Sequence, residues 1–264
     1  MTEGKKILQS VRRIQRLSLA AVRESIRQRV AWLLLAVALL LTFAGMRLRE
    51  FNFGIHEARF LSDFATGTRT LLGGLLALLL PVLLFFPALE RQTLQLDLMH
   101  GASRGEWLFS RLFAVWVQLA CFVAVTTGVL AILLYWRGLP FDLAGLTLDT
   151  VMAFVRLAVI AAASLLLCTL CASSLLVLGL GALFVMAGQL APVLGHGCNY
   201  ESGIVCSIGA LLSGLVPNLQ ILDSPTAGTD LAGLPAITWV ILYGSGYCLL
   251  YASLAGLAFF RREL

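Results

Sequence analysis

Few side chains of this chain could bind a metal ion or carry out acid–base chemistry, and they lie far apart. The three histidines are His56, His100 and His196. Two are expected on the outer side of a membrane and one on the cytoplasmic side. A metal site instead needs its ligands to converge on one point. The long apolar runs also hold no Asp or Glu near their centres, which argues against a proton relay. The sequence therefore predicts no catalytic group, metal site or bound cofactor in this chain.

The six cysteines fall into two groups. Cysteine in an apolar run most often serves as a small buried apolar residue, and we expect this of Cys121, Cys168, Cys171 and Cys248. Cys198 and Cys206 instead share the stretch 196–235, which we expect to form an outer loop. If that stretch faces an oxidising compartment, the two are joined as a disulfide or remain free thiols, with a copper or sulfur role as a third reading.

A more informative polar segment, TLQLDLMHGASRGEWLFSR, occupies 93–111 between two apolar runs. Residues 91–99 are compatible with a short amphipathic helix that Gly101 would end. Ser103 followed three residues later by Glu106 forms a capping box, which predicts a new helix start. A helix break followed by a capped helix can transmit a push without making or breaking bonds. The alternative is an ordinary connecting loop.

The composition indicates which environment holds these elements. Hydrophobic residues make up 59% of the chain and charged residues 12%, and the mean hydropathy is +0.92. A bilayer core about 30 Å thick needs roughly 20 apolar residues per helix. We therefore expect an all-α polytopic membrane protein with six transmembrane helices and no large soluble domain.

Charge-free runs locate the spans, because a charged side chain at the bilayer centre costs about 2.5–3.5 kcal/mol. One run is too long for a single helix and divides near residues 171–174, giving a hairpin with an uncharged turn. The predicted spans are about 30–46, 70–89, 112–135, 152–172, 175–195 and 236–259. They form one transmembrane domain, 30–260, with a loop at 90–111 and an opposite, outer loop at 196–235.

Basic residues orient this domain, since they concentrate in cytoplasmic loops. Residues 1–29 predict a basic amphipathic helix that lies on the inner leaflet as an anchor, as a contact for a cytoplasmic partner, or as both. The tail 261–264 is expected on the same side. The basic residues expected in the cytoplasm are Lys5, Lys6, Arg12, Arg13, Arg16, Arg23, Arg27, Arg29, Arg91, Arg104, Arg111, Arg261 and Arg262. Those expected outside are Arg47, Arg49, Arg59, Arg69 and Arg137, with Arg156 at the edge of a span.

The net charge of +5 thus reflects topology and predicts no nucleic-acid partner. The first apolar run lacks a small-residue cleavage site, so we expect it to remain in the protein. Trp107 and Arg111 suit the membrane interface at the start of the third span.

The charged loop resembles that of type 2 ABC transporter permeases. The match consists of Glu90-Arg91-x-Thr93-Leu94, then Ser103-Arg104-x-Glu106-x-Leu108, then Arg111. The family pattern is approximately E-R-x-T-L followed by P-x-S-R-x-E-x-L-x-G-K/R. Phe51-Asn52-Phe53-Gly54 is similar to permeases grouped with multi-copper enzyme maturation transporters. The chain departs from the family at Gly101-Ala102, where proline is common, and at Ser110, where glycine is common.

This resemblance implies a coupling role for the loop. In relatives it docks into a separate ABC ATPase subunit, and the residues carried over are Glu90, Arg91, Thr93, Leu94, Ser103, Arg104, Glu106 and Arg111. The chain has no G-x-x-x-x-G-K-[ST] motif, so ATP and Mg are expected in that partner and no enzymatic activity is expected here.

The resemblance further implies a second permease copy or paralogue, a bacterial inner-membrane location and alternating access between the two permeases. A periplasmic partner would meet the outer loop. Drug, lipid, glycan, peptide and a sulfur- or copper-related species all remain open as substrate. The alternative function is a non-transporting membrane scaffold or assembly factor, which would form no stable complex with an ATPase.

Overall fold

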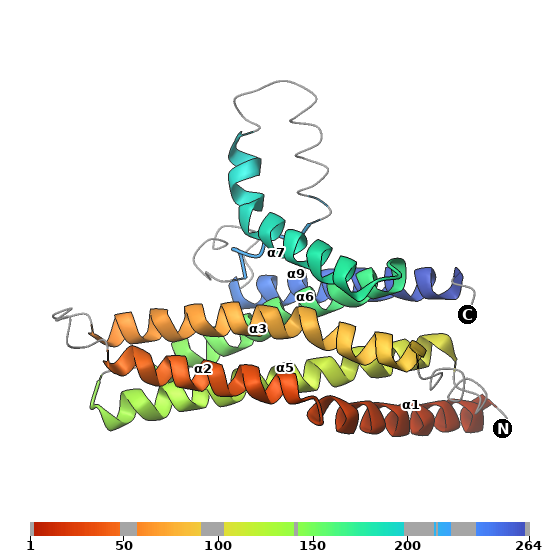
Figure 1. Ribbon diagram of the computed structural model, residues 1–264, viewed down its shortest axis with the longest axis horizontal. Helices are drawn as coiled ribbons and strands as arrows, with labels where there is room; N and C mark the ends of the chain where they lie inside the picture. Colours follow the sequence, from red (N-terminus) through yellow and green to blue (C-terminus); the bar gives the residue numbers. More distant parts are fainter. Residues whose placement is uncertain are drawn as a thin grey trace.

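The computed structural model describes residues 3–47, 57–90, 103–139, 142–197, 214, 216–222 and 236–261. The secondary structure of this part of the chain is helical, as predicted, and the helices run along a common long axis with the exception of α7 (Figure 1). They are α1 (Glu3–Ile26), α2 (Arg29–Arg47), α3 (Glu57–Glu90), α5 (Arg104–Trp136), α6 (Leu143–Leu170), α7 (Ser174–Gly197) and α9 (Ala236–Arg261).

Five of these helices, α3, α5, α6, α7 and α9, are long and apolar enough to cross a membrane. The pair α1 and α2, bent by 58° at a short break, would add a sixth crossing if it counts as one span. Each predicted span overlaps one helix, and the break between α6 and α7 falls at residues 171–173. Several helices extend beyond the charge-free runs, because a helix satisfies its own backbone hydrogen bonds outside the hydrocarbon as well as inside it.

The start of α1, the end of α3, the start of α5 and the end of α9 lie at the same end of the bundle (Figure 1). α7 leaves the bundle and projects to one side (Figure 1). The most extensive packing joins α6 to α9 and to α3, and α1 to α5. α6 therefore forms the centre of the helix packing, with α3, α5 and α9 around it.

Small residues on α6 allow this close packing. Ala158, Ala161, Ala162 and Ala163 are all buried, and side chains this small let neighbouring helix backbones approach. On α3, a Cβ atom added at Gly73 would lie 2.8 Å from the Leu157 side chain of α6 and 3.2 Å from Phe122 of α5. A larger residue at position 73 would force the Leu157 side chain to move.

Three expectations about individual residues prove wrong. Arg69 does not lie in an outer loop: α3 begins at Glu57, and the Arg69 side chain is 3% exposed within the bundle. Arg156 likewise lies inside α6 and is 2% exposed, so it is not at the edge of a span. Cys121 is an exposed residue of α5 and not a buried apolar one. Charge-free runs locate apolar sequence, but burial depends on which helix face meets a neighbour.

Candidate functional site

The first turn of α5 carries the predicted capping box, and the structure confirms it. Ser103 is the N-cap, with extended backbone angles of φ -78° and ψ 153°. Its hydroxyl accepts a hydrogen bond from the Glu106 backbone N–H at 3.1 Å, and the Glu106 carboxylate accepts one from the Ser103 N–H at 3.0 Å. Two amides that a helix start leaves without partners are thereby satisfied, which fixes where α5 begins.

We expect Ser103→Ala to loosen this helix start locally. Loss of an N-cap hydroxyl costs about 1 kcal/mol, so backbone amides of the first turn should exchange with solvent about fivefold faster. Hydrogen exchange resolved by mass spectrometry measures this. Ser245→Ala is the matched control, since the Ser245 hydroxyl is exposed within α9 and donates only to the Leu242 carbonyl of its own helix. Equal effects of the two substitutions would contradict the capping role.

Arg104, the first residue of α5, reaches the far end of the chain. Its Nη1 donates to the backbone carbonyl oxygens of Phe259 and Phe260 at 3.4 and 3.3 Å. Carbonyls in the last turn of a helix lack intrahelical partners and carry partial negative charge, so a guanidinium there is stabilising. Arg104 therefore fastens the start of α5 to the end of α9.

Trp107 lies one turn further on and is 1% exposed. Its ring stacks on Phe259 of α9, with centroids 5.9 Å apart and planes inclined by 18°. Phe85 of α3 lies against both rings, at 6.0 Å from Trp107 and 5.9 Å from Phe259. This aromatic cluster joins three helices and contains the tryptophan that the sequence predicts at the membrane interface.

Arg111 completes the attachment by reaching α1. Its guanidinium forms an ion pair with the Glu24 carboxylate of α1 and lies 5.1 Å from the Trp107 ring centroid. The Arg111 side chain is 8% exposed and that of Glu24 is 42% exposed. Arg111 is thus a packed residue that holds α1 against α5.

The sequence-derived set thus divides into two groups. Ser103, Arg104, Glu106 and Arg111 share the first two turns of α5, and Glu90 is exposed at the last residue of α3. Arg91, Thr93 and Leu94 lie outside the described residues, as do Cys198 and Cys206. The attachment also uses three residues that the sequence did not single out, Glu24, Phe85 and Phe259. The sequence feature that could have pointed to Glu24 is that it is a carboxylate within the strongly basic helix α1.

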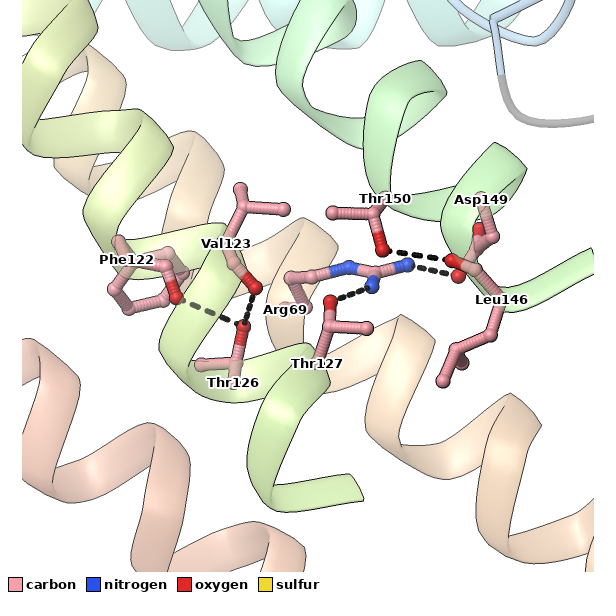
Figure 2. Close-up of polar contacts among 8 residues, drawn as sticks. All are labelled: Arg69, Phe122, Val123, Thr126, Thr127, Leu146, Asp149 and Thr150. Carbon is pink, nitrogen blue, oxygen red and sulfur yellow. Dashed lines mark hydrogen bonds and ion pairs between the residues drawn. The ribbon is translucent and has the colours of Figure 1, made fainter. Parts of the chain in front are cut away.

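A second polar cluster lies further along the bundle, where Arg69 of α3 meets α5 and α6 (Figure 2). The Arg69 guanidinium forms an ion pair with Asp149 of α6 and donates to the Thr127 hydroxyl of α5 at 2.9 Å. The Thr126 hydroxyl next to it donates back to carbonyls of its own helix. Asp149 is 36% exposed, so the pair connects the bundle interior to its surface.

The described residues contain no group of three or more His, Cys, Asp or Glu side chains that could hold a metal ion. The cysteines among them, Cys121, Cys168, Cys171 and Cys248, are free thiols. In this part of the chain the helices are therefore joined by hydrogen bonds, ion pairs and aromatic packing.

The fold and the site together define a class of protein, an all-helical one whose long apolar helices can span a membrane. At one end of the bundle the start of α5 is capped and packs against three other helices. No protein-family model and no curated protein matches the sequence.

Proposed function

We propose that this chain is the permease subunit of an ATP-driven transporter similar to the type 2 ABC exporters. It would cross a bacterial inner membrane six times with both termini in the cytoplasm. A separate ATPase subunit would bind ATP and Mg and push on the segment between α3 and α5. A second permease, identical or related, would complete the translocation path.

One observation carries this proposal: the start of α5 is attached to three other helices. Arg104 and Trp107 bind α9, Trp107 packs on Phe85 of α3, and Arg111 pairs with Glu24 of α1. Because close-packed interiors transmit displacement with little compression, a force applied just before Ser103 would move these helix ends together.

The charge distribution supports placing this end in the cytoplasm. The basic residues Arg104, Arg111 and Arg261 lie at this end, and so does the described part of the sequence motif that resembles the permeases. The start of α1 and the end of α9 are at this same end (Figure 1).

Glu90 is the described residue best placed to meet an ATPase. It is exposed and is the last described residue before the predicted coupling segment. Arg104 is a less direct probe of docking, because its guanidinium already binds the α9 carbonyls.

We expect Glu90→Arg to uncouple the complex while leaving the fold intact. Like charges brought together at an interface cost several kcal/mol, so stimulation of the partner ATPase by the permease should fall by about tenfold or more. The measurement is ATP hydrolysis by the co-expressed, reconstituted complex, with thermal unfolding of the permease as a fold check.

Asp63→Arg is the matched control, because Asp63 is an exposed acid of the same helix near its other end. It should leave ATPase stimulation unchanged. Equal loss of stimulation in both variants would contradict docking at Glu90. Failure of any ATPase subunit to copurify with the unaltered chain would contradict the transporter assignment and favour a membrane scaffold.

A further inference from the structure

The junction of α1 and α2 is a fixed elbow. The helices meet at 58°. The Trp32 indole N–H donates to the Ile26 carbonyl at the end of α1 at 2.7 Å. The backbone N–H of Gln28 donates to the Ser25 carbonyl at 3.0 Å, and the N–H of Ala31 to the Gln28 carbonyl at 3.2 Å. Because these bonds satisfy backbone groups at the break, the bend has a defined geometry.

A cavity of about 200 Å³ lies beneath this elbow. Its lining comes from α1, α2, α3 and α5 and is apolar apart from one amide and one thiol. The lining residues are Ile26, Ala31, Trp32, Leu35, Leu76, Gln118, Cys121, Phe122 and Val125. An apolar cavity of about 150 Å³ already holds a molecule such as benzene, so this one has room for a segment of hydrocarbon chain.

Two arginines flank the cavity lining in the sequence. Arg27 directly follows the lining residue Ile26, Arg29 lies two residues before the lining residue Ala31, and both are exposed. Neither guanidinium forms an ion pair with any residue that the structure describes. Leu35 lies six residues beyond Arg29 on α2, which is about 9 Å along the helix. The site thus combines two exposed arginines at the helix break with an apolar interior.

We propose that this elbow cavity binds one acyl chain of an anionic phospholipid, whose phosphate is held by Arg27 and Arg29. Guanidinium groups bind phosphate with paired hydrogen bonds, and the apolar walls favour a hydrocarbon chain over water. A protein helix is too wide for a space of this volume. The proposal requires only that these helices lie in a bilayer, and it is independent of the transporter assignment.

Cys121 provides a direct probe, because its thiol lines the cavity. The experiment follows N-ethylmaleimide labelling of Cys121 in the full chain in detergent micelles, by peptide-resolved mass spectrometry. Added phosphatidylglycerol should slow labelling by about fivefold or more at saturating lipid, as mass action requires for a mostly occupied site. Phosphatidylcholine, which carries no net charge, should slow it much less at the same concentration.

Arginine substitutions test the site for the lipid headgroup separately from the site for the acyl chain. Arg27→Gln combined with Arg29→Gln should raise the phosphatidylglycerol concentration needed for protection by about tenfold, since each interfacial arginine contributes to anionic lipid binding. Arg16→Gln, an exposed arginine elsewhere on α1, should leave it unchanged. Equal protection of Cys121 by the two lipids, or equal effects of the two sets of arginine substitutions, would overturn the proposed headgroup site.

The control for chain occupancy is a thiol outside the cavity. Ala124 is exposed on α5 close to Cys121 and does not line the cavity. In the variant Ala124→Cys with Cys121→Ala, phosphatidylglycerol should leave labelling unchanged. Absence of protection at Cys121, or the same protection at the introduced thiol, would overturn the assignment of the cavity to a lipid chain.

Discussion

Asp149→Asn is expected to lower the free energy of unfolding by about 3 kcal/mol, because it leaves the Arg69 guanidinium charged and buried without its counterion. Arg69 is 3% exposed, and its described polar partners are Asp149 and Thr127. The partial exposure of Asp149 places the effect at the lower end of the range for buried pairs. Reversible denaturation of the purified protein in mixed detergent micelles measures it.

Two comparisons identify the ion pair as the cause. Asp142→Asn makes the same change on the same helix, but Asp142 is an exposed N-cap whose carboxylate accepts from the Ala144 and Gly145 amides. Asparagine caps a helix about as well, so this variant should change stability by less than about 0.5 kcal/mol. Adding Arg69→Met to Asp149→Asn should recover part of the loss, because it removes the unpaired charge. If Asp142→Asn were as damaging as Asp149→Asn, this account would fail.

Trp107→Ala is expected to have the other large effect, a loss of about 3–5 kcal/mol in the free energy of unfolding. The ring is 1% exposed and contacts Phe85, Phe259 and the Arg111 guanidinium. Its removal leaves a cavity between three helices. Hydrogen exchange should also rise in the first turn of α5 and the last turn of α9, since both lose the packing that joins them.

Trp136→Ala is the matched control, since Trp136 ends the same helix and is 84% exposed. It should shift stability by less than about 0.5 kcal/mol and leave exchange at the start of α5 unchanged. Similar losses in the two variants would show that the aromatic cluster does not hold the start of α5. Together, the two variants test the attachment without any assumption about a partner subunit.

The packing of α1 on α5 changes the interpretation of the N-terminal helix. Its sequence predicts a membrane-surface anchor or a contact for a cytoplasmic partner. The Glu24–Arg111 ion pair also makes α1 part of the structure that surrounds the start of α5. Under the proposed function, a push on this region would reach α1 directly, and from there the fixed elbow would pass it to α2.

Features that depend on a short stretch of chain could be predicted from the sequence. The capping box needs only Ser103, Glu106 and the amides between them, and it forms as expected. The apolar run that contains Cys171 is longer than one span, which predicts a turn within it. α6 and α7 are separated there. Hydropathy and capping are properties of one helix at a time, so no tertiary contact is needed to infer them.

Contacts between distant residues were decided by the tertiary structure alone. Asp149 lies 80 residues after Arg69, Arg111 lies 87 after Glu24, and Phe259 lies 155 after Arg104. Which of these charges pair depends on which helices become neighbours and on which face each turns inward, and hydropathy carries no such information. The sequence by itself therefore determined an array of apolar helices and a capped helix start. Helix packing decided that Arg69 is buried and that α1, α3 and α9 all hold the start of α5.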